Sequence, residues 1–185
     1  MPEIAMNILD VAENSVRAGA DLIEITVAAQ PKADTLRVVI KDDGCGMDKE
    51  QVEKVQDPFY TTRTTRKVGL GVPFFKQAAL STGGTFQIDS EKGKGTTVEA
   101  VFTLSHIDRM PLGDITSTIH TLVVFNEKID FVYTYRYGEK EFVLDTREIR
   151  EIVGEEVSFT QKEISGFIRE FLETNKLETD GGADI

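Results

Sequence analysis

Residues 41–47 read Lys-Asp-Asp-Gly-Cys-Gly-Met, and they close a strand-like run that begins at Thr35. The glycines allow the backbone to turn sharply and to approach a ligand closely. A buried Asp42 carboxylate at the end of this strand could accept a hydrogen bond from an exocyclic amine, which would select adenine over guanine. Taken alone, the same pattern is also typical of an ordinary turn in which an aspartate bonds its own backbone.

The segment before this loop reads as an amphipathic helix over residues 3–18, with Pro2 suited to its first turn. Asp10 and Asn14 lie four residues apart, so they share one side of that helix, with Asn7 on the same stripe. A carboxylate can accept a proton from water, and an amide oxygen can bind Mg²⁺. Viewed alone, polar residues opposite an apolar arc usually face solvent.

After the loop, residues 67–71 read Lys-Val-Gly-Leu-Gly and lead into a helix. Free backbone N–H groups at a helix start, preceded by basic side chains, can bind phosphate oxygens. The spacing differs from that of a P-loop and from a dinucleotide fingerprint. Further on, residues 93–96 read Gly-Lys-Gly-Thr, a hairpin turn whose Thr96 hydroxyl could reach a base edge.

Hydrophobic periodicity around these segments predicts an α+β chain. We expect helices at residues 3–18, 48–55 and 70–81, and strands at residues 22–28, 35–41, 85–89 and 96–104. This order implies a mixed sheet with helices covering one face, which is a two-layer α/β sandwich.

Composition excludes several classes of protein. The net charge of −11 disfavours nucleic-acid binding, which depends on neutralising phosphates. No apolar run is long enough to cross a bilayer, the first residues lack a signal-peptide pattern, and the single cysteine excludes an internal disulfide framework. We therefore expect a cytoplasmic protein that does not enter a membrane.

Pro111 and Gly113 mark a boundary, so we divide the chain into residues 1–105 and an acidic extension at residues 106–185. In the extension we expect strands at residues 118–126, 129–137 and 141–144. A capping-box pattern at Thr160 and Glu163 predicts a helix, which we expect to dock on its own chain, with binding to a second chain as the alternative. Its apolar face would carry Ile164, Phe167, Ile168, Phe171 and Leu172, and residues 175–185 would form a frayed tail.

Taken together, these segments resemble the sequence boxes of the GHKL superfamily, named for gyrase, the heat-shock chaperone, histidine kinases and MutL. Residues 9–20 look like the N-box in its MutL style, and residues 41–47 resemble the G1 box. Residues 57–63 are similar to the histidine-kinase F-box, residues 69–72 look like the G2 box, and residues 83–96 match the histidine-kinase ending. The resemblance covers about residues 3–104 and implies the Bergerat ATP-binding fold.

The resemblance also implies a ligand, a metal and a set of contacts. ATP and Mg²⁺ would be bound together. The residues carried over are Asn14 for Mg²⁺, Asp42 for the adenine amino group, Gly44 and Gly46 for the shape of the base pocket, Lys67, Gly69, Leu70 and Gly71 for the β- and γ-phosphates, and Thr96 for adenine. No ligand role follows for Arg17.

Two features depart from the family pattern. Hydrolytic members carry a glutamate four residues before the metal-binding asparagine, whereas this chain has Asp10, whose shorter side chain predicts slow hydrolysis. Asp10 is still the candidate base, and Lys67 would neutralise charge during transfer. The segment between Phe59 and Gly69 is short and lacks a Gly-x-Gly, which predicts weak closure over the phosphates and fast nucleotide exchange.

Three functions are compatible with these residues. The first is a stand-alone protein kinase of the serine or histidine type that phosphorylates a separate, unidentified protein partner. The second is a non-catalytic module whose ATP occupancy is sensed by a partner, and the third is a slow MutL-like ATPase. We expect no phosphoacceptor hairpin ahead of the N-box helix, and we interpret His106 and His120 as structural residues and Cys45 as a small filler beside the base pocket.

Overall fold

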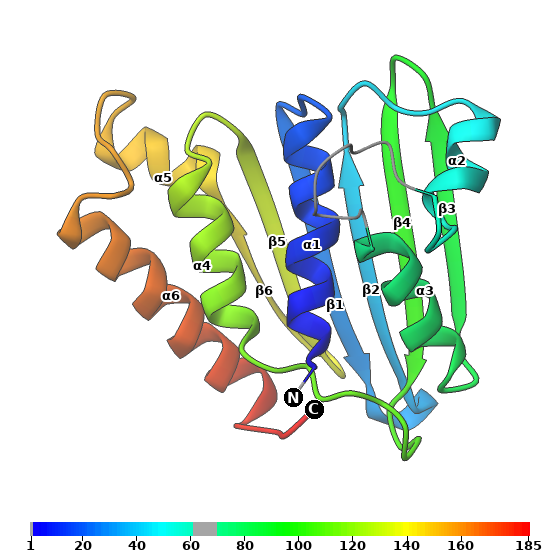
Figure 1. The fold of residues 1–185 in the computed structure, drawn as a ribbon. Helices are drawn as coiled ribbons and strands as arrows, with labels where there is room; N and C mark the ends of the chain where they lie inside the picture. The colour runs from blue at the N-terminus through cyan, green and yellow to red at the C-terminus, as the bar shows by residue number, and fades with distance from the viewer. Residues whose placement is uncertain (1, 61–69) are drawn as a thin grey trace.

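The computed structural model describes residues 2–60 and 70–185. Six strands form one sheet in the order β3-β4-β2-β1-β5-β6 (Figure 1). The strands are β1 (Leu22–Gln30), β2 (Thr35–Asp42), β3 (Thr85–Glu91), β4 (Gly95–Thr103), β5 (Asp130–Tyr137) and β6 (Lys140–Asp145). A short 3-10 helix, η1 (Pro31–Ala33), connects β1 to β2.

The sheet is mixed, because β1 pairs with β5 in parallel and every other pairing is antiparallel. Burial alternates strictly along β1 and β2, as expected for strands with one covered face. Ile23, Ile25 and Ile40 point into the core, whereas the residues that alternate with them along each strand, such as Glu24 and Lys41, face the opposite side of the sheet.

The α-helices of the described residues lie on one face of the sheet (Figure 1). They are α1 (Ile4–Arg17), α2 (Lys49–Val55), α3 (Gly71–Leu80), α4 (Ile115–Phe125), α5 (Thr146–Val153) and α6 (Lys162–Asp180). This arrangement confirms the predicted α+β class and its two-layer sandwich. Of the helices in the described ranges, none is both long and apolar enough to span a bilayer.

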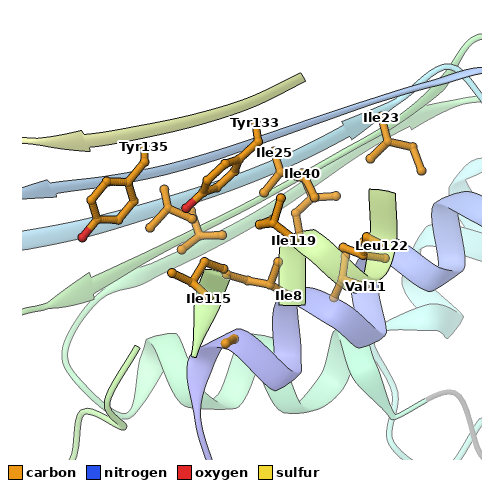
Figure 2. Close-up of a cluster of buried hydrophobic side chains, with 14 of the residues drawn as sticks. Ile8, Val11, Ile23, Ile25, Ile40, Ile115, Ile119, Leu122, Tyr133 and Tyr135 are labelled. Atoms are coloured by element: carbon orange, nitrogen blue, oxygen red, sulfur yellow. The ribbon is translucent and has the colours of Figure 1, made fainter. Parts of the chain in front are cut away.

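The core lies between the central strands and helices α1 and α4. Figure 2 shows Ile8 and Val11 of α1 and Ile119 of α4 pointing toward Ile25 and Ile40 of the sheet. These five side chains are at most 2% exposed. Burying an aliphatic side chain of this size stabilises a fold by about 1.5–3 kcal/mol, so this cluster fixes α1 against the sheet.

One strand prediction was wrong, because residues 115–125 form helix α4 and not a strand. The β-branched residues of this segment favour a strand locally, but its buried positions include Ile115, Ile119, Leu122 and Val123, which follow the helical period. The Asp114 carboxylate accepts a hydrogen bond from the Ser117 N–H at 2.9 Å, which caps the helix start.

Three further predictions for the C-terminal part were wrong, and one helix there was not predicted. Helix α5 was not foreseen, and α6 has no side-chain cap, with Gln161 and not Thr160 at its N-cap position. Residues 175–180 continue α6, so they are not a frayed tail. Phe167 was placed on the apolar face but is 51% exposed, whereas Ile168 and Leu172 are fully buried.

The end of α6 is held by buried polar contacts. The Tyr135 hydroxyl donates to Asp180 Oδ2 at 2.7 Å, and Lys176 Nζ donates to the same oxygen at 2.7 Å. Because a buried carboxylate needs such donors, both bonds stabilise Asp180, and the bond from Tyr135 of β5 fixes α6 on the sheet of its own chain, as predicted for this helix.

The other elements agree with the sequence predictions to within a few residues. The division into residues 1–105 and 106–185 stays a prediction, and in space both parts contribute strands to one sheet across the β1–β5 pairing. Their apolar residues also belong to one core cluster.

Candidate functional site

Helix α1 carries the first predicted site residues on the flank that faces α3. The Asp10 side chain lies against the start of α3, since a Cβ added at Gly71 would lie 2.9 Å from Asp10 Cβ. A side chain at position 71 would therefore push the two helices apart. Asn7, one turn before Asp10, is 9% exposed, and its Oδ1 has no hydrogen-bond partner within the described ranges.

Asp42 ends β2 as a carboxylate that is 9% exposed. Ser15 Oγ of α1 donates to Asp42 Oδ2 at 2.6 Å, and the Gly44 N–H donates to Asp42 Oδ1 at 2.9 Å. Among the described residues, no lysine, arginine or histidine forms an ion pair with this carboxylate. The carboxylate is thus held by neutral donors and presents acceptor oxygens.

Two glycines let the loop after β2 lie directly against the β3–β4 turn. Gly46 has a φ of +66°, and a Cβ there would lie 2.0 Å from the Glu91 carbonyl oxygen. Gly95 has a φ of +129°, and a Cβ there would lie 2.0 Å from the Asp42 carbonyl oxygen. Both positions therefore require glycine for backbone conformation and for space.

These elements enclose a cavity of about 430 Å³, within the size range of small-molecule sites. Four predicted site residues line it: Asn14, Asp42, Gly46 and Thr96. They come from α1, the end of β2, the following loop and β4, so the fold brings together residues that are far apart in sequence. The apolar wall is formed by Val11, Val72, Ile88 and Val98.

The remaining predicted residues lie around the cavity or outside the described residues. Lys67 and Gly69 fall in the part of the chain that is not described, as does most of the segment between Phe59 and Gly69. Leu70 is the N-cap residue of α3, and Gly71 is its first residue. Asp10, Gly44, Leu70 and Gly71 are not among the residues that line the cavity.

The structure adds lining residues for which sequence patterns predicted no binding role: Ser15, Arg17, Met47, Gln51, Val55 and Tyr60. Arg17 Nη2 donates to Asn14 Oδ1, and Arg17 also forms an ion pair with Glu13 at 3.7 Å. The three-residue spacing of Asn14 and Arg17 on one helix was the available signal for this contact. The Arg17 side chain places positive charge beside the amide oxygen.

Thr96 is oriented by a residue that the sequence did not indicate. Thr96 Oγ1 lies 2.8 Å from Ser90 Oγ of β3, and the Met47 N–H donates to the same Ser90 oxygen at 2.8 Å. Ser90 therefore connects the loop after β2 with the start of β4. Cys45, predicted as a small filler, is exposed and lines the cavity.

The donor set fits a nucleotide with its metal better than a metal held by protein alone. Within the described ranges, no group of three histidine, cysteine, aspartate or glutamate residues could hold a metal ion. Mg²⁺ commonly takes one or two protein oxygens and completes its shell with phosphate and water. The Asn14 amide oxygen in the cavity is consistent with that arrangement.

Comparison with known families agrees with this geometry. The family model described as histidine kinase-, DNA gyrase B-, and HSP90-like ATPase matches residues 3–106, which is more than half of the chain. The chain belongs to this family, within the GHKL superfamily, and residues 3–106 are its histidine-kinase-like ATP-binding domain.

Similar proteins match about half of this chain. A putative sensor protein of Shewanella frigidimarina is 31% identical over 103 residues, which cover 55% of this chain and 16% of that protein. Sporulation kinase C of Bacillus subtilis is 28% identical over 96 residues, covering 52% and 22%. Sensor histidine kinase WalK of Bacillus subtilis is 35% identical over 89 residues, covering 45% and 14%. The chain thus spans less than a quarter of these three relatives.

A solved structure shares the fold beyond the family domain. The crystal structure of the N-terminal domain of a DNA repair protein superposes with a TM-score of 0.57 at 15% identity. The match covers 84% of this chain and 58% of that chain, so it includes part of the extension after residue 106. At this identity the likeness concerns the fold alone.

Proposed function

We propose that this protein binds Mg·ATP and acts as a protein kinase of the serine or histidine type on a separate protein partner in the cytoplasm. The observation that carries the proposal is the cavity that unites Asn14, Asp42, Gly46 and Thr96 within a histidine-kinase-like domain. Kinases among the relatives, such as sporulation kinase C, support phosphoryl transfer over simple binding.

In this proposal the adenine lies at the Asp42 end of the cavity. The carboxylate oxygens accept a hydrogen bond from the 6-amino group of the base, and the backbone of Gly46, held against the β3–β4 turn, forms part of the wall of the base pocket. Thr96, oriented by Ser90, contacts the base edge, while Val11, Ile88 and Val98 provide apolar contacts. A guanine would place its carbonyl oxygen against the carboxylate, so it is disfavoured.

The triphosphate extends from there toward the start of α3. The backbone at Gly69, Leu70 and Gly71 and the Lys67 side chain are proposed to hold the β- and γ-phosphates. Asn14 Oδ1 is proposed as the protein ligand of Mg²⁺, with Arg17 exchanging its bond to that oxygen for a phosphate contact. Bound Mg²⁺ would neutralise charge on the phosphates during transfer.

Asp10 is the proposed base of the reaction. It lies on the same flank of α1 as Asn14 and against the first residue of α3, where the terminal phosphate would sit. A carboxylate there can accept the proton of an attacking hydroxyl or imidazole as the phosphoryl group is transferred. Lys67 would balance the charge that develops on the phosphoryl oxygens.

Calorimetric titration with Mg·ATP tests the binding part of the proposal. We expect saturable binding that Asp42→Asn weakens about ten- to a hundred-fold or more, because hydrogen bonds to a charged group are worth about 1.5–3 kcal/mol. Asp89→Asn is the matched control, since it makes the same change at an exposed position of β3. No detectable binding of adenine nucleotides by the unchanged protein would contradict the proposal.

Radiolabelled γ-phosphate separates the three functions. Label on a co-purified partner protein supports the kinase, whereas release of free phosphate alone indicates a slow ATPase, and binding without turnover indicates a sensing module. Asp10→Asn should abolish turnover and spare binding, and surviving turnover would remove Asp10 from the mechanism. Asn14→Ala should remove the Mg²⁺ dependence of binding, and an unchanged dependence would refute the ligand assignment.

A further inference from the structure

Ser15 makes the most direct side-chain contact to the carboxylate on which the proposed base recognition depends. It follows Asn14 on α1 and is 3% exposed, so its position in the helix is that of a core residue. Its hydroxyl nevertheless donates to Asp42 Oδ2 across 27 residues of sequence, at 2.6 Å. This distance is typical of a hydroxyl donating to an ionised carboxylate.

The Ser15 hydroxyl could instead have bonded a carbonyl oxygen of its own helix. A serine inside a helix usually bonds the carbonyl oxygen one turn before it, which for Ser15 would be that of Val11. The Ser15 hydroxyl instead donates its one hydrogen bond to Asp42. Only the Gly44 N–H also donates to this carboxylate from within the described ranges, and it bonds the other oxygen. Each carboxylate oxygen is therefore fixed by one donor.

This arrangement determines what Asp42 can offer to a ligand. With Oδ1 and Oδ2 each oriented by one donor, the carboxylate plane is held on two sides, and the remaining lone pairs are the available acceptors. A buried carboxylate that lost one of these donors would turn toward another or draw in water. Its acceptor direction would then no longer be set for a ligand amine.

We propose that Ser15 is a positioning residue that sets the specificity of the cavity for 6-aminopurine nucleotides by orienting the Asp42 carboxylate. The inference rests on the proposed function, since it concerns the same base-recognition site. Ser15 does not need to touch the nucleotide, because its effect reaches the base amine through Asp42. The consequence is that removing the hydroxyl should weaken binding only of ligands that carry this amine.

Ser15→Ala tests the proposal when two nucleotides are compared. Binding of Mg·ATP and of the Mg²⁺ complex of purine riboside triphosphate, which lacks the 6-amino group, is measured by calorimetry for both proteins. We expect the substitution to weaken ATP binding about ten-fold, as for loss of one hydrogen bond to a charged group, and to change the other affinity by less than about two-fold. The difference isolates the coupling between hydroxyl and amine.

Two further variants separate positioning from stability. Ser15→Thr retains the hydroxyl and should restore selectivity for the amine. Ser81→Ala removes an exposed hydroxyl that bonds the Ala78 carbonyl at the end of α3 and should leave both affinities unchanged. Thermal denaturation of the unliganded proteins checks that Ser15→Ala remains folded.

Each outcome of these measurements either supports or overturns the proposed role of Ser15. Equal weakening for both nucleotides, or no weakening for either, overturns the role of Ser15 while leaving the proposed ATP binding intact. Failure of the unchanged protein to bind ATP overturns both the proposed function and this inference. Selective weakening with ATP supports them together.

Discussion

At the scale of single residues, the close contact between Gly46 and the Glu91 carbonyl oxygen is one of two places in the site that require glycine, the other being Gly95. A Cβ at Gly46 would overlap that oxygen, and Gly46 also has a positive φ. Gly93 shares the positive φ, at +84°, but nothing lies within 4 Å of a Cβ placed there. Gly46 and Gly93 therefore separate the cost of backbone conformation from the cost of lost space.

We predict that Gly93→Ala lowers the free energy of unfolding by about 1 kcal/mol, the conformational cost of a left-handed alanine. Gly46→Ala should cost about 3 kcal/mol or more, because the backbone of the β3–β4 turn must also move. Urea denaturation measures both changes. Equal costs for the two variants would show that the loop yields easily and that the cavity wall is not rigid.

Some residues of the site could be predicted from the sequence, whereas two serines could not. Asp42, Asn14 and Thr96 were predicted as site residues because their segments resemble the sequence boxes of the family, and all three line one cavity, while their roles stay predictions. Ser15 and Ser90 could not, because each acts through a hydrogen bond to a residue distant in sequence or on a neighbouring strand. A serine on the buried arc of a helix gives no local sign that its proton goes to another element.

At the scale of elements, helices α4 and α6 differ in how they begin. Asp114 accepts hydrogen bonds from both the N–H and the hydroxyl of Ser117, and these bonds hold the pKa of Asp114 below its usual value. Helix α6 begins without a side-chain cap, although Thr160 lies just before it. The sequence pattern predicted a capping box only at Thr160 and Glu163, and it was wrong because a capping box requires a backbone path that only the folded chain defines.

We predict that Asp114→Ala lowers the free energy of unfolding by about 1 kcal/mol, as for loss of a helix cap. Thr160→Ala should change it by less than about 0.5 kcal/mol, the range of ordinary surface substitutions. Because the folded-state pKa of Asp114 is lowered, its contribution is present at neutral pH and is lost as the pH falls through that pKa. Denaturation of both variants at neutral pH tests the contrast, and a larger loss for Thr160→Ala would contradict it.

Helices α4 and α6 are joined by a buried histidine. His120 Nε2 lies 3.0 Å from the Ser165 carbonyl oxygen and hydroxyl, and Arg169 Nη2 lies 3.2 Å from His120 Nδ1. Since arginine can only donate, Nδ1 accepts, and the ring is neutral with its proton on Nε2. Burial lowers the pKa of His120, and the Arg169 charge lowers it further, against the opposing effects of Ser165 and Glu173.

Stability should therefore fall on mild acidification. As the pH drops through about 6.5, the unfolded chain binds a proton at this histidine while the folded chain does not, so the free energy of unfolding decreases. We predict that between about pH 7.5 and about pH 5.5 the unchanged protein loses up to about 1 kcal/mol more than His120→Gln. Urea denaturation at the two pH values measures this, and equal losses would exclude the effect.

Secondary structure was predictable wherever the hydrophobic period and the turn signals agreed, as for β1, β2 and α1. Helix α4 was not predicted, because its β-branched residues favour a strand locally. The helical period becomes visible only in the positions that are buried in the folded structure. The last turns of α6 were missed because Thr179 and Asp180 are polar yet buried, and their partners lie on other turns and on β5. The hydrogen bonds that allow these polar residues to be buried form only in the tertiary structure.

At the scale of the whole molecule, one sheet joins the ATP-binding domain to the extension. We keep the division at residues 105 and 106 as a proposal about sequence units, since the family model ends at residue 106. The parallel pairing of β1 with β5 and the packing of Ile115 and Ile119 in the common core lead us to expect that both parts unfold together.

Native-state hydrogen exchange tests this expectation. Amides of β2 and of β5 should exchange with the same free energy of opening, equal to that of global unfolding. Exchange of β5 at a clearly lower free energy would show that the extension opens as a separate unit. Only the second result would make residues 106–185 an independent folding unit.

The two ends of the chain meet at the same place. The N–H groups of Ile4 and Ala5 donate to the carbonyl oxygens of Pro111 and Leu112, and the Leu112 N–H donates to the Ile185 carbonyl oxygen (Figure 1). A short linker could therefore close the chain into a circle, and new ends could be opened at Gly138 in the β5–β6 hairpin. Such a circular permutant would keep α1 and its cavity residues within one uninterrupted polypeptide, with its termini at an edge of the sheet.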